Sequence, residues 1–350
     1  MAPPALPEKA GQRHRKRVSV ARRITPPAPL QRPCRLRRLG DRFPSPAMLR
    51  ALGLPGFPFR WLRARGQALR RGRERTGLAT SLPGPLSYAV FDGPSTQPPL
   101  VFLHGLFGSK ANFTSLAKKL VLQTGRKVLT VDARNHGDSP HSPLMTYEAM
   151  SADVHLLLHQ LQLNRCILVG HSMGGKTAMS FTLRWPELVE GLVCVDISPS
   201  ETTGVTSFQH FVAALKAVEV PRGIPRSTAR RLAEDQLRLT IQEPTIRQFL
   251  LTNLVYTEDR FVWRVNLEAI SRHLKDLMGF PDFRTSYQGP TLFLGGSNSG
   301  YISSDDYPEI ERLFPQAEIQ YIPDAGHWVH ADQPQQFLAA VCSFLERPPL

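Results

Sequence analysis

The sequence predicts an α/β fold with a mostly parallel sheet covered by helices on both faces. From about residue 86, short apolar runs alternate with stretches of helical spacing. Most of these runs are apolar throughout, which is typical of parallel strands buried on both faces. A stretch of 94 residues, 197–290, interrupts the alternation and predicts a helical insertion.

The positive charge of the chain is confined to its beginning. The 350 residues carry a formal charge of +14, which on its own would suggest a nucleic-acid or membrane-surface protein. Residues 1–80 hold 20 Lys and Arg but 3 acids, whereas residues 81–350 hold 23 basic and 26 acidic residues. The body therefore has a net charge of −3 and the composition of an ordinary globular domain.

The N-terminal segment has the features of a targeting leader. Residues 1–85 hold 13 of the 31 prolines, and residues 48–76 interleave leucine and aromatic residues with eight arginines and one acid. Arg-rich, acid-poor leaders are typical of organelle import, and the apolar core of a secretory signal is missing. We expect residues 1–80 to be a partly disordered mitochondrial transit peptide, with Met48 as an alternative start. The alternative is a basic tail that binds polyanions, including nucleic acid.

The body is predicted to be one domain, residues 81–350, without a transmembrane segment, metal or cofactor. No run reaches the roughly 18 apolar residues that a membrane-spanning helix needs. The four cysteines lie far apart and form no metal-binding spacing, which favours free thiols in a reducing compartment. They are Cys34, Cys166, Cys194 and Cys342.

The elements follow in chain order. Strands are expected at 86–91 (an edge strand), 100–104, 127–132, 166–170, 191–196, 290–295 and 318–322. Helices are expected at 111–122, 146–161, 173–184 and 334–346. Gly105 ends the second strand, and Thr146 with Glu148 marks a helix start, since a hydroxyl caps the first amides and an acid complements the helix dipole.

The interrupting segment is predicted to be a helical cap over about residues 199–287. Helical spacing recurs near 207–218, 227–240, 245–255 and 265–278. Ligands of α/β sheets bind at the carboxyl ends of the strands, so a cap would lie there; a helical appendage elsewhere is the alternative. Six of its residues would line an apolar acyl pocket or simply pack the cap: Phe208, Phe211, Leu215, Phe249, Leu250 and Trp263.

A nucleophile is predicted at Ser172. Gly170, His171, Ser172, Met173 and Gly174 fit the G-x-S-x-G nucleophile elbow, with an apolar strand before and a helix after. The sharp turn strains the serine backbone and leaves no room for side chains at 170 and 174. A structural serine turn is the alternative.

The general base is predicted to be His327. A serine hydroxyl is a weak nucleophile and needs a base, which in this strand order follows the last strand. His327 lies five residues past that strand, in a loop with Pro323 and Gly326. His330 is the competing candidate, on the approach to the next helix.

The acid that orients the base has several candidates. Asp196 is preferred because it ends the strand that follows the nucleophile helix, on the same edge of the sheet. Glu268 in the cap is the alternative acid. Asp305 and Asp306 arrive late in the loop after the strand 290–295 and are expected to start a helix. Asp132 is expected to have a structural ion-pair role beside Arg134.

The oxyanion hole is predicted at the backbone amides of Leu106 and Met173. Residues 103–108 read L-H-G-L-F-G, a glycine-rich turn after the first central strand. Such a turn supplies one N–H donor, and the residue after the nucleophile supplies the other. Phe107 is a second candidate for the first donor.

Five motifs together resemble the α/β-hydrolases related to bacterial short-chain esterases, especially a mitochondrial branch. They are H-G-L-F-G-S (104–109), V-D-A-R-N-H-G-D-S (131–139), V-G-H-S-M-G-G-K (169–176), V-D-I-S-P (195–199) and A-G-H-W (325–328). The resemblance spans about 86–350. The family's nucleophile and base fall on Ser172 and His327, its strand-end acid on Asp196 and a cap acid position on Glu268.

The resemblance implies a mitochondrial matrix serine hydrolase that cleaves carboxylic esters, with diacylglycerol among the candidate substrates. It also implies association with the 2-oxoglutarate dehydrogenase complex and its lipoylated component. The competing hypothesis is an interaction protein with weak or no catalysis on a hydrolase scaffold. Dehalogenases and epoxide hydrolases are disfavoured because they need an aspartate where Ser172 stands.

Overall fold

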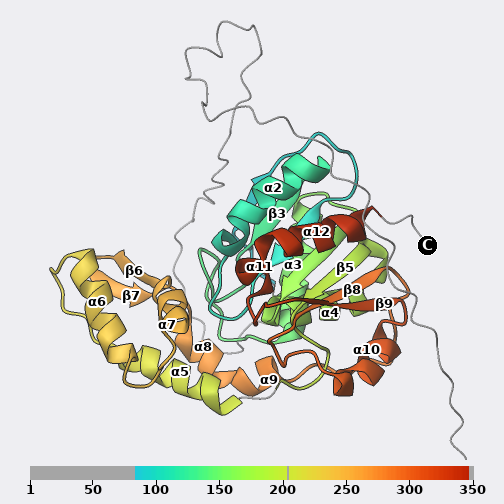
Figure 1. Cartoon of the computed structure of the whole chain (residues 1–350). Coiled ribbons are helices and arrows are strands. Elements are labelled where there is room, and N and C mark those ends of the chain that lie inside the picture. Colours follow the sequence, from blue (N-terminus) through green and yellow to red (C-terminus); the bar gives the residue numbers. More distant parts are fainter. Residues whose placement is uncertain (1–82, 203–204, 347–350) are drawn as a thin grey trace, which may run out of the picture. The chain divides into compact units, whose positions relative to one another are not determined.

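The computed structural model describes residues 83–202 and 205–346, which form a seven-stranded sheet with covering helices (Figure 1). The strand order is β1-β3-β2-β4-β5-β8-β9, and every neighbouring pair is parallel except β1 with β3. The strands are β1 (Tyr88–Phe91), β2 (Leu100–Leu103), β3 (Val128–Val131), β4 (Cys166–His171), β5 (Val189–Val195), β8 (Thr291–Gly296) and β9 (Ala317–Ile322). The predicted fold class is confirmed.

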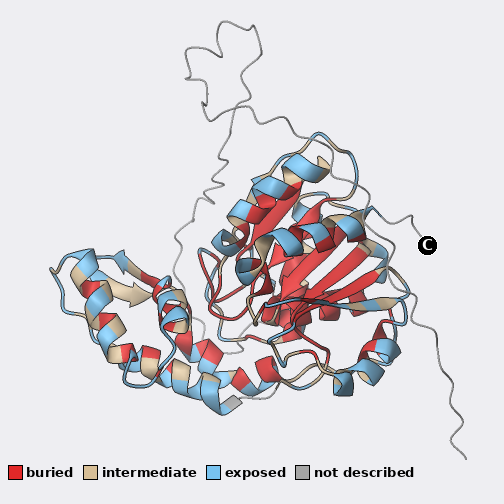
Figure 2. Ribbon diagram, viewed as in Figure 1, coloured by how far each residue is buried: buried red, intermediate tan, exposed pale blue. Residues whose placement is uncertain are grey.

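Helices bury both faces of the sheet. Neighbouring residues of a strand point to opposite faces, so Val101 and Phe102 enter two different apolar clusters. The first cluster takes α3 (Tyr147–Gln160), α4 (Met173–Arg184) and α10 (Tyr307–Leu313), and the second takes α2 (Thr114–Thr124), α11 (Val329–Asp332) and α12 (Pro334–Leu345). The central strands are therefore buried along their length (Figure 2), as their unbroken apolar runs predict.

Cys166 and Cys194 lie buried on the adjacent strands β4 and β5 as free thiols. Burial raises the pKa of the Cys166 thiol to about 12 and that of Cys194 well above its ordinary value. Cys342 on α12 is also free and is partly exposed. The expectation of free thiols is confirmed for these three cysteines.

The segment between β5 and β8 contains helices and one hairpin (yellow to orange in Figure 1). Its elements are α5 (Val205–Ala217), α6 (Arg226–Leu237), α7 (Pro244–Leu251), β6 (Leu254–Thr257), β7 (Arg260–Trp263), α8 (Leu267–Arg272) and α9 (Leu274–Met278). The hairpin β6–β7 was not predicted. Its two-residue turn places Glu258 and Asp259 at φ 48° and 59° rather than using the Asn-Gly pair that signals such turns.

This insertion packs on loops at the carboxyl ends of β2 and β3. One apolar cluster joins its helices to Leu106, Phe107 and Tyr147 of the body. Asn253 donates its side-chain amide to the Phe107 carbonyl at 2.8 Å, and the Asn266 amide donates to the Asn135 carbonyl at 2.9 Å. The insertion is thereby bonded to the same loops that border the nucleophile.

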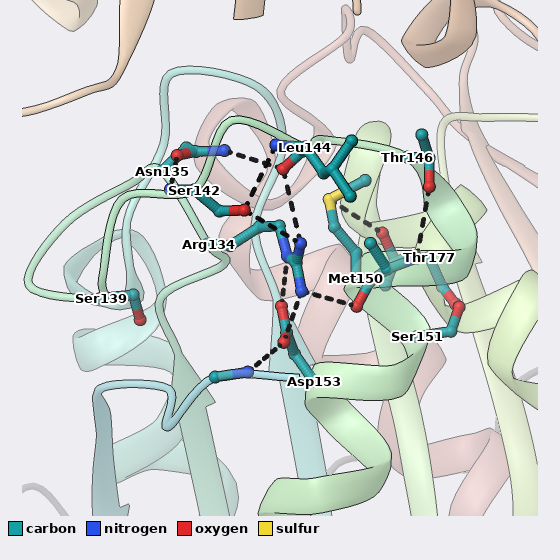
Figure 3. Close-up of polar contacts among 12 residues, drawn as sticks. Arg134, Asn135, Ser139, Ser142, Leu144, Thr146, Met150, Ser151, Asp153 and Thr177 are labelled. Carbon is teal, nitrogen blue, oxygen red and sulfur yellow. Dashed lines mark hydrogen bonds and ion pairs between the residues drawn. The ribbon is translucent and has the colours of Figure 1, made fainter. Parts of the chain in front are cut away.

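A buried ion pair holds the β3–α3 loop in place (Figure 3). Arg134 binds both carboxylate oxygens of Asp153, with Nε–Oδ2 at 2.6 Å and Nη2–Oδ1 at 2.7 Å. Both side chains are almost fully buried. Asn135, at φ 66°, accepts from the Ser142 amide at 2.7 Å and closes the turn. Because the insertion is hydrogen-bonded to Asn135, the Arg134–Asp153 ion pair supports both the β3–α3 loop and the insertion.

The ion-pair role expected for Asp132 has a different partner from the one suggested by sequence. Asp132 is fully buried and pairs with the Lys110 ammonium, and it also accepts the Lys110 amide at 2.7 Å. Arg134 points instead to Asp153 on α3. Sequence proximity is misleading here because the chain turns away from β3 immediately after its last residue.

The predicted transit peptide, residues 1–80, and Met48 lie outside the described residues. Within residues 83–202 and 205–346, no helix is both long enough and apolar enough to cross a bilayer.

Asp153→Ala should lower the free energy of unfolding by about 3–5 kcal/mol, because it leaves the Arg134 guanidinium buried without its anion. Urea unfolding followed by circular dichroism measures this. Glu148→Ala is the matched control: its ion pair with Arg184 is half exposed, so about 1 kcal/mol or less should be lost. Equal losses in the two variants would contradict a special role for the buried pair.

Candidate active site

Ser172 lies on a strained turn between β4 and α4. Its backbone has φ 53° and ψ −119°, a conformation that side-chain-bearing residues rarely adopt. Its amide donates to the Val195 carbonyl at 3.1 Å, and its own carbonyl accepts from Gly175 at 2.8 Å. The strand-turn-helix context predicted for the nucleophile is thus present, and the turn is bonded to the end of β5.

Glycine is required on both sides of Ser172. A Cβ on Gly170 would lie 2.2 Å from the Gly174 carbonyl oxygen, and one on Gly174 would lie 2.2 Å from the Leu103 carbonyl oxygen. Both obstacles are backbone atoms of packed elements and cannot move aside. The helix therefore approaches β2 and β4 as closely as backbones allow, which is the physical reason for the two glycines.

His327 and Asp196 meet at the carboxyl edge of the sheet. His327 follows β9, and its Nδ1 lies 2.7 Å from Asp196 Oδ2. Asp196 directly follows β5, at φ 50°, and is 1% exposed, whereas the His327 side chain is 16% exposed. Since Nδ1 donates to a carboxylate, Nε2 is left with its lone pair.

Two further donors hold the Asp196 carboxylate. The Gly296 amide donates to Oδ1 at 2.9 Å, and the Ser299 hydroxyl donates to Oδ2 at 2.5 Å. The first comes from the last residue of β8 and the second from the loop that follows it, in which acids arrive late in the sequence. A hydroxyl in this loop thus reaches Asp196 from the adjacent strand end. The G-G-S-N-S-G-Y pattern contains the signal, but residue type alone does not give the direction of the side chain.

Tyr301 packs against His327 and lines the pocket at Ser172. Its ring stacks on the His327 ring with centroids 3.8 Å apart and planes 21° apart. Tyr301 and Ser172 also line the same pocket. Tyr301 follows the glycine- and serine-rich stretch 295–300 and belongs to none of the five motifs, so the sequence alone did not single it out.

The other candidate acids lie elsewhere. Glu268 is 75% exposed on the side chain and pairs with Lys216 at 2.9 Å. Asp306 ends the short 3₁₀ turn Ser304–Asp306, and hydrogen bonds from Ser200, Ser303 and Ser198 lower its pKa despite its burial. The structure brings Asp196, not these residues, to His327.

The proposed oxyanion donors border the same pocket. Leu106, Met173 and Ser172 all line it. The Phe107 amide, the other candidate, donates to His136 Nε2 at 3.1 Å and is therefore already used. Met173 is the first residue of α4, where the first amides have no partner within the helix. This arrangement favours Leu106 over Phe107.

Two buried histidines pack behind His327. His171 donates its Nε2–H to the His327 carbonyl at 2.8 Å, which fixes the loop that carries the base. His330 lies between Phe113 and His171, with ring centroids 4.9 and 4.7 Å away. Burial lowers the pKa of His330 to about 4 and that of His171 well below its ordinary value, so both are neutral near pH 7.

The pocket at Ser172 lies between the body and the insertion. Its walls are Leu106, Tyr147, Ser172, Met173, Lys176, Ile197, Thr202, Phe208, Leu277, Met278 and Tyr301. Of the six cap residues expected to line an acyl pocket, Phe208 does so, and the other five pack in the apolar cluster of the insertion. Within the described part of the chain, no group of three or more His, Cys, Asp and Glu side chains could hold a metal ion.

Comparison with known proteins places the chain in a family. It matches the family described as alpha/beta hydrolase fold over residues 98–334. The "sn-1-specific diacylglycerol lipase ABHD11" of Danio rerio is 61% identical over 269 residues, which cover 77% of this chain and 85% of that protein. The chain therefore belongs to the α/β-hydrolase fold family.

Bacterial relatives agree with this placement. "Esterase YbfF" of Escherichia coli is 35% identical over 247 residues, covering 71% of this chain and 92% of that protein. The solved structure "Marine microorganism esterase" superposes with a TM-score of 0.69 at 36% identity, covering 75% of this chain and 99% of the other. The resemblance to bacterial esterases predicted from the five motifs is confirmed.

His330→Phe should make the protein less sensitive to acid. The pKa of His330 is about 4 in the folded chain and 6.5 ordinarily, so as pH falls from 6.5 toward 4 only the unfolded chain gains this proton and stability is lost. Between about pH 7.5 and pH 5 this histidine should account for about 2 kcal/mol of lost unfolding free energy, which the variant retains.

Urea unfolding at the two pH values measures the difference. His210→Gln, at an exposed position on α5, is the control and should follow the wild type. If His330→Phe loses as much stability on acidification as His210→Gln, the buried neutral state of His330 is not a source of acid sensitivity.

Proposed function

We propose that this α/β-hydrolase cleaves carboxylic esters as an esterase or lipase, through a triad of Ser172, His327 and Asp196. The observation that carries the proposal is the 2.7 Å contact of His327 Nδ1 with the buried Asp196, at the strand edge that also bears the strained Ser172 turn. A buried carboxylate on Nδ1 holds the tautomer in which Nε2 can accept a proton. A structural serine turn would not need such a partner.

In the acylation step, Ser172 Oγ attacks the ester carbonyl carbon while His327 Nε2 takes its proton. The carbonyl oxygen becomes an oxyanion, which the amides of Leu106 and Met173 stabilise by hydrogen bonds. As the carbon–oxygen bond to the alcohol breaks, His327 gives its proton to the leaving alcohol. The product is an acyl-serine, and Asp196 stabilises the transient imidazolium without becoming protonated itself.

In the deacylation step, water replaces the alcohol. His327 takes a proton from water, whose oxygen attacks the acyl carbon, and the second oxyanion uses the same two amides. Collapse returns the proton to Ser172 Oγ and releases the carboxylic acid. Neither of these two reaction steps requires a metal or cofactor.

Acylglycerols such as diacylglycerol are the proposed substrates. Relatives named diacylglycerol lipase, about 61% identical, support this choice, as does a pocket with apolar walls around Ser172. The apolar residues Leu106, Phe208 and Leu277 would contact an acyl chain, since they border the nucleophile from both the body and the insertion.

Location and partners are proposed on other grounds. The Arg-rich leader supports import into the mitochondrial matrix. Binding of the 2-oxoglutarate dehydrogenase complex rests on the family resemblance alone. The alternative of a weakly catalytic interaction protein rests on the late arrival of an acid in the loop after the strand 290–295. Pull-down of the complex with the Ser172→Ala protein tests whether partner binding needs catalysis. Retained binding would mean that catalysis is dispensable for the interaction.

Ser172→Ala should abolish labelling by a fluorophosphonate probe, because the probe forms a covalent bond with an activated serine oxygen. Gel fluorescence of the intact protein and the variant measures this. Ser180→Ala, a buried serine further along α4, is the control and should label like the wild type. Undiminished labelling of Ser172→Ala, or none of the wild type, would refute the serine-hydrolase proposal.

Asp196→Asn should lower kcat for ester hydrolysis by about 10³-fold or more, because an amide can hold the imidazole in the wrong tautomer. Glu268→Gln should change kcat by less than about twofold, since Glu268 faces solvent and pairs with Lys216. Steady-state kinetics with p-nitrophenyl acetate compare them. A full-activity Asp196→Asn enzyme would overturn the assignment of the acid.

A further inference from the structure

Lys176 is a buried lysine on the nucleophile helix, and the proposed reaction does not use it. It lies one turn after Ser172 on α4, is 1% exposed, and lines the same pocket. Desolvating an ammonium group is costly unless hydrogen bonds replace the lost water. The partners of Lys176 therefore indicate what keeps it there.

The Lys176 ammonium binds both ends of the insertion. Nζ lies 2.8 Å from the Ser200 carbonyl and 2.8 Å from Thr202 Oγ1, on the segment that leads into the insertion. It also lies 2.7 Å from the Met278 carbonyl and 3.0 Å from the Gly279 carbonyl, on the segment that leads out. The last two carbonyls belong to the C-terminal end of α9, where carbonyls lack helical partners.

The two ends are also joined to each other and to a second body residue. The Thr202 amide donates to the Met278 carbonyl at 2.8 Å. The Tyr147 hydroxyl, from α3, donates to the Leu277 carbonyl at 2.6 Å. Of these two body residues, Lys176 is the one whose hydrogen bonds reach both the entering and the leaving segment.

The residues so held form the wall of the pocket. Thr202, Leu277 and Met278 line it together with Ser172 and Met173. The Lys176 side chain therefore links this part of the wall to α4, the helix that directly follows Ser172. A change in the length or bonding of that side chain would move the wall relative to Ser172.

We propose that Lys176 is a positioning residue that fixes both ends of the insertion to the nucleophile helix and thereby sets which acyl chains fit beside Ser172. This inference rests on the proposed esterase activity. It predicts that losing the ammonium changes the binding of long acyl chains, which need the whole pocket, more than the binding of an acetyl group.

The test uses the full-length chain with p-nitrophenyl acetate and p-nitrophenyl dodecanoate. Lys176→Met keeps an unbranched apolar side chain but removes every donor. Its KM for the dodecanoate should rise about tenfold, because the hydrogen bonds of Nζ to both ends of the insertion are lost, while kcat and KM for the acetate change less than about threefold. Lys176→Gln, which keeps two N–H donors, should recover part of the dodecanoate KM.

Arg126→Met is the matched control. Arg126 is also buried and donates to a backbone carbonyl, that of Pro98 at 3.0 Å, but it lies away from the pocket and the insertion. It should lower stability without changing the ratio of kcat/KM for the two esters. An unchanged ratio in Lys176→Met, or an equal change in Arg126→Met, would overturn the positioning role.

Two additional measurements keep the result interpretable. Thr202→Val removes one acceptor of Lys176 and leaves the lysine in place, so it should raise the dodecanoate KM as well. It provides the test if Lys176→Met does not fold. Hydrogen exchange needs no substrate: amides of 274–279 should exchange at least about tenfold faster in Lys176→Met, with those of α12 unchanged.

Unaltered exchange at 274–279 refutes the attachment itself. If the wild type hydrolyses neither ester but residues 274–279 still exchange faster in Lys176→Met, the proposed function is refuted and the attachment is supported. The two failures are therefore distinguishable.

Discussion

The close approach of α4 to the strands β2 and β4 is the constraint on which the rest of the site depends. Gly170 and Gly174 let backbone meet backbone at distances that no Cβ permits, and this forces Ser172 into its strained turn. The same approach sets the Ser172 amide on the Val195 carbonyl, next to Asp196. One junction thus holds the proposed nucleophile Ser172, the proposed acid Asp196 and the proposed oxyanion donor Met173, whereas His327 comes from a longer loop.

That longer loop is restrained by several weak bonds rather than by one strong one. The His327 carbonyl accepts from His171, its ring stacks on Tyr301, and its Nδ1 meets Asp196. Asp196 in turn accepts hydrogen bonds from Gly296 at the end of β8 and from Ser299 in the loop that follows. Neutral buried histidines suit this packing, because a charged ring behind the base would disfavour the imidazolium that the proposed reaction forms.

Sequence predicts those parts of the molecule that depend on local pattern. The apolar strands, the Thr146 cap and the glycine pair each follow from neighbours in the chain, and the helix at 173–184 is found at those residues. Asp196 could be ranked first because parallel strands end at one edge. The roles of Ser299, Tyr301 and Lys176 could not be predicted, since each depends on contacts between segments about a hundred residues apart or on side-chain direction. The partner of Asp132 was missed for the same reason, because long-range packing decides between locally equivalent choices. The Glu258–Asp259 hairpin was missed because its turn lacks the Asn-Gly pair that signals such turns.

The two thiols at the centre of the sheet have a consequence for how the protein can be observed. Cys166 and Cys194 sit on adjacent strands, with raised pKa values and no exposed surface, so in the folded chain neither forms the thiolate that alkylating reagents attack. They become reactive only when β4 and β5 separate. Cys342 on α12 is partly exposed and needs no such separation for access, although partial burial raises its pKa as well. Within the described residues, the alkylation rate of Cys166 and Cys194 should therefore report global opening of the sheet, whereas that of Cys342 should report the accessibility of the surface.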